Sequence, residues 1–423
     1  MEIKQLNLAN LADMRPKIRQ PEFDPRTLSP GIVHLGIGAF HRAHMAFHTQ
    51  RAIAGDPANP GNGNWGIRGV SFRSAAVRDK LSPQDFLYTL SSRVNETEEL
   101  EIIGTVRDII FTGDDPAMCP ALIADATTKI VSMTITEKGY CHDPATGRLE
   151  ENHSGIATDL KNIDHPTTAI GAIVQGLRLR CDAKGGPLTL MSCDNLPSNG
   201  AVLERIVRRY TDLADPGLIG WIDDHVRFPK SMVDRIVPAT TDQDRSHIEK
   251  ALGLHDQSPV IAEAFSQWVI EDNFSAGRPA WETAGVEMVG EVEDYETMKL
   301  RLLNGPHSSC AYLGFLAGYE TVSKLMANDI FPSFLRRMMD QEINPGLTVP
   351  DGVDIEAYKT SVLERFVNRA LAHRTHQIAM DGSQKLPQRL LDSVRAALDK
   401  NLPLDCLALS VAAWMKYATG SDE

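Results

Sequence analysis

The sequence predicts an α/β domain followed by a mostly helical domain. Short runs of β-branched and apolar residues recur through the first two-thirds of the 423 residues and alternate with helix-like segments. This alternation is typical of a largely parallel sheet covered by helices. After about residue 290 the apolar residues recur at the helical period instead. A chain of this length favours two domains, which we place at residues 1–290 and 291–423.

The first predicted strand ends in a glycine-rich turn. The apolar run "GIVHL" leads into "GIGAFHRAH", where Gly36 permits a tight strand-to-helix turn and Gly38 lets backbone approach a pyrophosphate. The start of the following helix offers unpaired N–H groups to the anion, and an arginine could add a charge-assisted contact. The residues predicted to hold cofactor phosphates here are Gly36, Gly38, Ala39, Phe40 and Arg42.

The same stretch has a competing interpretation as a metal site. His41, His44 and His48 stand at i, i+3 and i+7, so they would share one face of a helix. No carboxylate or thiolate lies nearby in the sequence, and the histidines fall in the turn that the glycines make. We therefore favour histidines that pack or hydrogen-bond locally, and we expect no metal.

The remaining elements follow in order. Further strands are predicted at "WGIRGVSF", "KIVSMTIT", "PLTLMSC", "DRIVPA" and "QWVIED", with helices over Ile170–Arg180 and Ala201–Leu213. The Pro/Gly-rich "AGDPANPGNGNWG" is a long connection, because the α/β pattern resumes after it. The second domain should contain helices over Met298–Leu303, Cys310–Met326, Ile355–Ala372, Leu386–Leu398 and Leu404–Tyr417.

The end of the second strand bears on the choice of cofactor. In dinucleotide-binding domains an acidic residue there binds the ribose 2′-hydroxyl of NAD. Here Arg73 and Ser74 follow the strand without an acid, and a guanidinium could accommodate a 2′-phosphate. These residues leave both NAD and NADP open.

The segment "YETMKLRLLNGPHSS" contains parts suited to alcohol oxidation. A desolvated Lys299 with lowered pKa could take the hydroxyl proton, the Asn304 amide could stabilise the alkoxide, and His307 could position the substrate. The plainer interpretation is a solvated Glu296–Lys299 pair followed by a helix break at the Gly-Pro pair. A third is the Tyr295-x3-Lys299 spacing of short-chain dehydrogenases, whose pair normally lies within the nucleotide-binding unit.

Polar residues elsewhere are weaker candidates. Asn195 follows the strand in "LMSCDNLPSNG", at the end of the sheet where doubly wound folds place ligands, although an Asx turn would also explain it. Asp234 in "FPKSMVDRIVPATT", and Arg374 and Lys385 around the turn in "HRTHQIAMDGSQKLPQR", are each plausible surface residues when taken singly.

Composition narrows the function classes. A net charge of −13, from 56 acidic and 43 basic residues with no basic run, argues against nucleic acid as a partner. No stretch of about eighteen apolar residues suggests a membrane span, so we expect a cytoplasmic protein. The six cysteines are scattered without C-x-x-C pairs, as expected for reduced thiols. A small molecule is the expected partner, and the sequence leaves monomer or dimer open.

Seven ordered motifs together resemble the mannitol dehydrogenase family, the long-chain polyol and aldonate dehydrogenases. They are "GIGAFHRAH", "TITEKGY", "SCDNLPSNG", "MVDRIVPATT", "QWVIEDNF", "KLRLLNGPHS" and "DGSQKLPQRLL", and the resemblance runs from about residue 30 to the end. It implies a Rossmann-type domain followed by a helical domain, an active site between them, NAD as cofactor and no metal.

The resemblance also implies roles for individual residues. The lysine base falls on Lys299, the oxyanion-stabilising asparagines on Asn195 and Asn304, and the substrate-binding histidine on His307. Further correspondences are Asp234 and Lys385 as substrate contacts, and Glu137 and Glu296 as acids that pass the lysine proton to solvent. The chain departs from the family pattern at Lys230, Pro306 and Gln377.

The expected reaction is reversible hydride transfer between NAD(H) and a secondary alcohol of a sugar acid or polyol. A buried substrate carboxylate must be paired, and Arg374 and Lys385 are close in sequence to the turn that the family places at its substrate pocket. We therefore favour reduction of fructuronate to mannonate over a mannitol 2-dehydrogenase activity. The alternative from another class is an NAD-binding regulatory protein that has lost catalysis.

Overall fold

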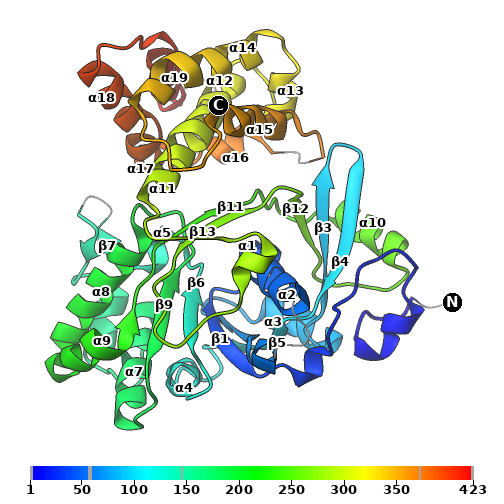
Figure 1. Cartoon of the computed structure of the whole chain (residues 1–423), viewed down its shortest axis with the longest axis vertical. Coiled ribbons are helices and arrows are strands. Elements are labelled where there is room, and N and C mark those ends of the chain that lie inside the picture. Colours follow the sequence, from blue (N-terminus) through cyan, green and yellow to red (C-terminus); the bar gives the residue numbers. More distant parts are fainter. Residues whose placement is uncertain (1–2, 56–59, 144–145, 371–372, 421–423) are drawn as a thin grey trace. The chain divides into compact units, whose positions relative to one another are not determined.

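The computed structural model describes residues 3–55, 60–143, 146–370 and 373–420 (Figure 1). The chain forms two compact units. One consists of Met1–Ser92 and Glu98–Val292, and the other of Arg93–Thr97 and Glu293–Glu423. The first is an α/β unit, and the second is mostly helical, as the sequence predicts.

A six-stranded parallel sheet lies at the centre of the first unit. Its strands are β1 (Pro30–Leu35), β2 (Gly66–Ser71), β5 (Val106–Phe111), β6 (Ile130–Met133), β9 (Leu188–Ser192) and β10 (Val226–Arg227). Their order is β10-β9-β6-β1-β2-β5, and all neighbours run parallel. Successive strands are added on one side of β1 and then on the other, so the crevice between the carboxyl ends of β1 and β6 is a topological switch point. The Rossmann-type fold is thereby confirmed.

Helices bury both faces of this sheet. Against one face lie α4 (Met118–Ala124), α7 (Ala169–Asp182) and α8 (Asn199–Ala214), and against the other lie α1 (Ala39–Ala43) and α2 (Met45–Gly55) (Figure 1). Along β1, Val33 and Leu35 pack into the core that contains Ile173 of α7, whereas Ile32 packs into the core that contains Ile53 of α2. Burial on both sides explains why the strands are continuous apolar runs.

Two smaller sheets complete the first unit, and one strand in them differs from its predicted bounds and pairing. One sheet joins β11 (Ser231–Asp234), β13 (Gln267–Glu271) and β14 (Glu287–Val289); the other joins β12 (Val260–Glu263), β3 (Tyr88–Val94) and β4 (Thr97–Ile103). The strand predicted at "DRIVPA" instead ends at Asp234, and beyond it the Ile236 N–H donates to the Glu263 carboxylate rather than to a strand ladder. It pairs antiparallel with the strand at "QWVIED", outside the parallel sheet. The sequence does not predict β3, β4, β12 or β14 of these small sheets, nor β5 and β10, which form the two edges of the parallel sheet.

The smaller helices and the short strand pair of the first unit connect these elements. They are α3 (Ala76–Leu81), α5 (Thr136–Gly139), α6 (Ser154–Asp159), α9 (Ile219–His225), α10 (Asp242–Leu252), β7 (His142–Asp143) and β8 (Arg148–Leu149). The Pro/Gly-rich connection contains a short 3-10 helix, Pro60–Asn64, after the end of α2 at Gly55. All six cysteines are free thiols.

The second unit is built from helices around a separate apolar core. They are α11 (Glu293–Lys299), α12 (Gly305–Leu316), α13 (Val322–Met326), α14 (Ile330–Arg337), α15 (Ile355–Val367), α16 (Thr375–Ala379), α17 (Gly382–Leu386), α18 (Asp392–Asp399) and α19 (Asp405–Tyr417). Three π-helical segments extend this set: Leu300–Asn304, Met338–Ile343 and Pro387–Leu391.

Four of the predicted helices of this unit differ from the observed ones by more than one residue. The helix predicted over Met298–Leu303 begins earlier, at Glu293, and continues as the π-helical segment Leu300–Asn304. The helix predicted over Cys310–Met326 is divided, because α12 ends at Leu316 and α13 begins after Thr321, whose side chain accepts the Lys324 N–H. The helix predicted to end at Ala372 ends at Val367, and Ala372 lies outside the described residues. The helix predicted over Leu386–Leu398 contains the π-helical segment between α17 and α18.

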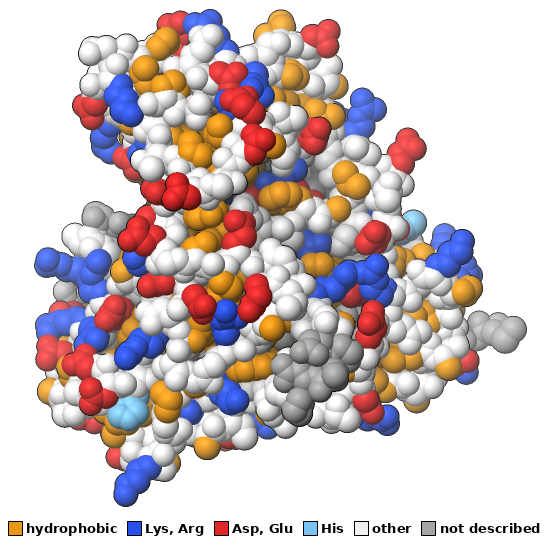
Figure 2. Space-filling view, viewed as in Figure 1, with side chains coloured by type: hydrophobic (Ala, Val, Ile, Leu, Met, Phe, Trp, Pro, Cys, Tyr) orange, Lys and Arg blue, Asp and Glu red, His pale blue; other side chains and the backbone are white. Residues whose placement is uncertain are grey.

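The surface carries both signs of charge. Figure 2 shows lysine and arginine side chains interspersed with aspartate and glutamate over the face that it presents. Among the described residues, no helix has the length and apolar content needed to cross a membrane.

Candidate active site

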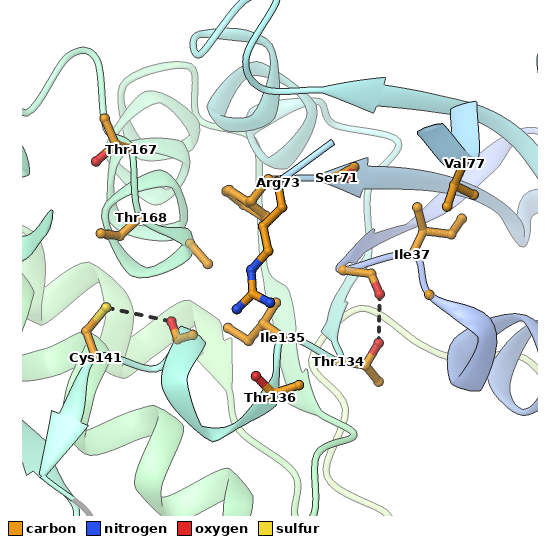
Figure 3. A pocket seen from close by; sticks show the side chains of 15 residues that line it. Ile37, Ser71, Arg73, Val77, Thr134, Ile135, Thr136, Cys141, Thr167 and Thr168 are labelled. Atoms are coloured by element: carbon orange, nitrogen blue, oxygen red, sulfur yellow. Dashed lines mark hydrogen bonds between the residues drawn. The ribbon is translucent and has the colours of Figure 1, made fainter. Parts of the chain in front are cut away.

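A pocket of about 450 Å³ opens at the carboxyl ends of β1, β2 and β6 in the first unit (Figure 3). It lies at the switch point of the sheet, where open α/β folds bind their ligands. Four segments line it: the turn after β1 (36–38), the end of β2 with α3 (71–73 and 77), the end of β6 with α5 (134–136, 139 and 141), and the start of α7 (167–169).

Gly36 makes the turn after β1 possible. Its φ is +89°, and a Cβ at this position would lie 2.3 Å from the Thr134 carbonyl oxygen, so the turn excludes any side chain. A Cβ on Gly38 would meet only the Gly36 oxygen, at 3.9 Å. The position that a Gly38 side chain would occupy is therefore part of the open pocket. This arrangement is that of a phosphate-binding turn.

The other residues predicted to hold the cofactor lie at different distances from the pocket. Arg73 lines it together with the two glycines, and Ser74 follows in the chain and accepts the Ala76 N–H. Arg42 is only 5% exposed. It donates to the Ser258 carbonyl oxygen at 2.6 Å and lies over the Tyr88 ring. The residues that the sequence proposed but that are not among those lining this pocket are Ala39, Phe40, Arg42 and Ser74.

The histidines after the turn stack with other rings. The His41 ring lies 3.5 Å from the His34 ring of β1, and His44 and His48 each lie beside Trp268. Burial lowers the pKa of His34 to about 3 and that of His48 to about 4. Within the described parts of the chain, no group of three or more His, Cys, Asp or Glu side chains is placed to hold a metal ion.

Arg73 is the cation of the pocket. Its side chain extends from the end of β2 into the cavity towards Ile135 (Figure 3). None of the described lining residues is acidic, so the carboxylate that would bind a ribose 2′-hydroxyl is missing from these walls.

The wall formed by Thr167 and Thr168 is fixed by a buried carboxylate. One Asp159 oxygen accepts the Thr167 N–H at 2.7 Å and its hydroxyl at 2.8 Å. The other accepts the Thr168 N–H at 2.9 Å and its hydroxyl at 2.6 Å. The sequence analysis did not identify this wall. Its one signal is a threonine just before the predicted helix, in a position to cap it.

Three more candidates of the first unit lie at strand or helix ends. Asn195 is exposed and comes just after β9, and Glu137 is exposed on α5, which follows the neighbouring strand β6. Asp234 is the last residue of β11 and is 4% exposed.

In the second unit, Lys299 and Asn304 bracket a π-helical turn. Lys299 is the last residue of α11 and is 4% exposed, and Glu296 lies one turn earlier in the same helix. The Gly305 N–H bonds the Leu300 carbonyl oxygen, five residues back. Such i→i+5 bonding places residues five apart on the same side of a helix, so Lys299 and Asn304 share a side. The buried Asn304 Oδ1 has no hydrogen-bond partner in the part of the chain described.

The Gly-Pro pair does not break this helix. The backbone stays helical from Glu293 to Leu316, and Pro306 directly follows the π-helical turn inside this continuous stretch. The predicted helix break is therefore wrong. A Cβ on Gly305 would lie 2.7 Å from the Arg389 carbonyl oxygen, so this glycine lets the segment Pro387–Leu391 approach α12 closely.

His307 lies in a positive electrostatic environment. Its ring stacks on Phe366 at 5.2 Å and lies 4.8 Å from His373. Burial, and then the charges of His373, Arg389, Arg365 and Lys385, hold the pKa of His307 well below its usual value. The imidazole is therefore neutral at ordinary pH and can act only through hydrogen bonds. Arg365, Lys385 and Arg389 are called the basic cluster below.

The two cations proposed near the "DGSQK" turn have different surroundings. Lys385 donates to the Met380 carbonyl oxygen at 2.7 Å and belongs to the basic cluster. Arg374 instead lines a separate pocket of about 510 Å³ with Lys324 and Arg369. The structure therefore groups Lys385 with His307, and Arg374 with other surface cations. Arg365 and Arg389 were not proposed from the sequence; Arg389 follows Lys385 by four residues, whereas Arg365 comes from α15 and is brought there by folding.

Comparison with known proteins identifies the family. The mannitol dehydrogenase Rossmann domain matches residues 30–283, and the mannitol dehydrogenase C-terminal domain matches residues 291–423. D-mannonate oxidoreductase of Escherichia coli K12 is 44% identical over 98% of this chain and 85% of that protein. Mannitol 2-dehydrogenase of Aspergillus fumigatus is 38% identical over 94% of this chain and 80% of that protein.

A solved structure agrees with both. The ternary complex of Pseudomonas fluorescens mannitol 2-dehydrogenase with NAD and D-mannitol superposes with a TM-score of 0.91 at 37% identity, over 98% of this chain and 84% of that one. The likeness extends through the pocket-bearing unit and the helical unit alike. The chain belongs to the mannitol dehydrogenase family of oxidoreductases.

Proposed function

We propose that this protein is an NADH-dependent reductase of a keto sugar acid, with fructuronate as substrate and mannonate as product. The observation that carries the proposal is the basic cluster around His307. A substrate carboxylate buried there would be paired with guanidinium and ammonium groups, whereas a neutral ketose needs no such charge. The 44% identity to a D-mannonate oxidoreductase supports the same choice.

The first unit is suited to NAD. The Gly36 turn excludes side chains and the pocket lies at the switch point, so Gly36 and Gly38 would face the pyrophosphate and Arg73 the adenosine end. The solved relative that contains NAD supports this cofactor. When bound, NADH supplies the hydride that reduces the carbonyl carbon.

The chain's own residues would handle the proton and the oxygen. In reduction the Lys299 ammonium gives its proton to the carbonyl oxygen, and in oxidation the amine takes it back. The amides of Asn195 and Asn304 donate to the oxygen as negative charge develops on it. Neutral His307 orients a substrate hydroxyl, with Asp234 as a further contact, and Glu137 and Glu296 return a proton from solvent to the lysine.

A polyol dehydrogenase is the second candidate. Relatives at 38% and 37% identity are named mannitol 2-dehydrogenase, and a lysine such as Lys385 can also donate hydrogen bonds to hydroxyls. The substrate would then be fructose, reduced to mannitol. A catalytically inactive NAD-binding protein is the alternative from another class.

The deciding experiment compares kcat/KM for fructuronate and for fructose in the wild type, in Lys385→Met and in Lys324→Met. Lys324 is an exposed, ion-paired lysine of the same unit and serves as the matched control. We expect the wild type to prefer fructuronate. Lys385→Met should lower kcat/KM for fructuronate roughly 10- to 100-fold, the loss of a charge-assisted hydrogen bond, with little change for fructose. Lys324→Met should change neither.

Two outcomes would refute the carboxylate assignment. One is a wild type that prefers fructose. The other is a Lys385→Met variant that loses the same factor on both substrates, because the lysine would then recognise hydroxyls common to the two.

A further inference from the structure

The carboxylate of Asp194 joins the ends of two neighbouring strands of the first unit. Asp194 follows β9, and its Oδ2 accepts the Ile135 N–H at 2.9 Å while its Oδ1 accepts the Thr136 N–H at 3.1 Å. Ile135 and Thr136 follow β6, the neighbour of β9 in the sheet. The Tyr140 hydroxyl adds a third bond, to Oδ2 at 2.9 Å. Two successive N–H groups that converge on one carboxylate form an anion-binding nest.

The segment that Asp194 holds is strained. Thr136 has φ +62°, which is a rare conformation for a β-branched residue and costs on the order of 1–3 kcal/mol. Such a conformation persists only where surrounding interactions determine it. Here the successive N–H groups of Ile135 and Thr136 are held by charge-assisted bonds to Asp194.

Asp194 is itself fixed from α8. The Asn199 side chain, 2% exposed, donates to the backbone oxygens of Ser192 and Asp194 at 3.2 and 3.1 Å. It also accepts the Ser231 N–H at 3.0 Å. These bonds fix the backbone of Asp194, from which the carboxylate extends to the turn.

The strained turn is next to the proposed cofactor pocket and to the proposed catalytic residues of this unit. Thr134, Ile135 and Thr136 line the pocket, and Glu137 is the next residue. On the other side, Asn195 follows Asp194 directly. One side chain thus connects the floor of the pocket, the proposed proton-relay acid and the proposed oxyanion-stabilising amide.

We propose that Asp194 is a positioning residue, whose ionised carboxylate holds the left-handed Thr136 turn against the end of β9 and so sets the floor of the cofactor pocket and the place of Glu137 relative to Asn195. The inference rests on the proposed binding of NADH. It assigns Asp194 no contact with substrate or cofactor.

The charge state of this carboxylate makes the proposal testable. Burial raises the pKa of Asp194 to about 6, against the opposing effect of its three hydrogen bonds. The titratable groups around it are the Tyr140 hydroxyl, Glu137, whose charge raises the pKa further, and the Cys193 thiol. Above this pH the carboxylate accepts both N–H groups as an anion, and below it one oxygen becomes a hydroxyl.

The experiment measures the Kd for NADH, by direct titration without substrate, between pH 5 and pH 8. Asp194→Asn keeps the shape but removes the charge. At pH 8 we expect its Kd to exceed that of the wild type roughly tenfold. The ratio should approach one below about pH 6 because both side chains are then neutral. A ratio near one at pH 8, or one that does not change with pH, would overturn the proposal.

The matched control is Glu342→Gln in the other unit. Glu342 is 1% exposed and likewise accepts two successive backbone N–H groups, of Cys406 and Leu407, at 2.9 and 2.8 Å. Its loss should lower the melting temperature and leave the NADH Kd unchanged at every pH. If Asp194→Asn behaves in the same way, its role is structural only.

A second variant covers the case in which Asp194→Asn fails to fold. Tyr140→Phe removes one bond that favours the ionised carboxylate, so the pH at which the NADH Kd changes should move upward from its wild-type value. An unmoved midpoint contradicts the proposal. An error in the assigned substrate would leave both titrations as expected, because no substrate is present.

Discussion

Lys299 carries the proposed proton transfer. It ends α11 in a nearly buried position and shares a side of the π-helical turn with Asn304. We expect Lys299→Ala to lower kcat roughly 10²- to 10⁴-fold, the usual contribution of general acid–base catalysis, with the NADH Kd nearly unchanged. Steady-state kinetics and NADH titration measure the two quantities.

Tyr295→Phe is the companion variant, because the short-chain interpretation makes Tyr295 the acid. It should retain most of the activity. If Tyr295→Phe abolishes activity and Lys299→Ala only weakens cofactor binding, Tyr295 rather than Lys299 is the acid–base residue.

We predict that Arg73 contributes to the discrimination between NADH and NADPH. It extends into a pocket whose described lining holds no acid, and a guanidinium pairs well with a phosphate monoester. We expect Arg73→Asp to lower kcat/KM for NADPH relative to NADH at least about tenfold, the effect of replacing an attraction by a repulsion. An unchanged ratio would show that Arg73 does not reach the ribose 2′ position.

At the scale of elements, the contact between α12 and the segment Pro387–Leu391 depends on Gly305. A methyl group there would lie 2.7 Å from the Arg389 carbonyl oxygen, so Gly305→Ala must push the two apart. We expect a loss of about 1–3 kcal/mol of unfolding free energy and a fall in kcat, since Asn304, His307 and the basic cluster flank this contact. Chemical denaturation and steady-state kinetics test both.

Gly220→Ala in α9 is the control for this substitution. Nothing lies within 4 Å of the added carbon there, so the exchange should be neutral or stabilise by up to about 1 kcal/mol. A Gly305→Ala protein as stable and active as the Gly220→Ala protein would show that the close approach is dispensable.

The histidines of α1 and α2 give the first unit a predictable sensitivity to acid. Burial lowers the pKa of His48 to about 4, whereas in the unfolded chain it titrates near its ordinary value of about 6.5. Between these pH values only the unfolded state binds the proton, so stability falls as the pH falls. His48→Gln should reduce this slope by up to about 1.4 kcal/mol per pH unit. The check is denaturant unfolding at several pH values, and an equal slope in the two proteins would contradict the burial argument.

At the scale of the whole molecule, periodicity predicted the two fold classes because the central strands β1, β6 and β9 are buried on both faces, whereas helices such as α8 bury one side. It failed at Asp234, where an antiparallel pair resembles a parallel strand in sequence, and at Leu316, where an apolar run continues past the helix end. The sequence singled out Gly36, Gly38 and Arg73 because backbone conformation and charge leave local signatures.

The remaining parts of the site depend on contacts between segments that are apart in the sequence. Asp159 and Asp194 act on residues that folding brings to them, and Arg365 and Arg389 join His307 from other helices. No spacing in the sequence reports such contacts. They can be found only once the strand order and the helix packing are known.

We propose that this molecule transfers hydride between NADH and a keto sugar acid by means of its own lysine and amides. The most direct test is the loss of NADH absorbance on addition of fructuronate, after dialysis against EDTA and elemental analysis for zinc, with fructose and other ketoses as comparisons. We predict turnover with fructuronate at a kcat/KM above that for fructose, undiminished by EDTA and lost in Lys299→Ala. Two results would contradict this mechanism. One is that NADH binds but none of the substrates causes its oxidation; the other is that activity disappears together with a stoichiometric zinc.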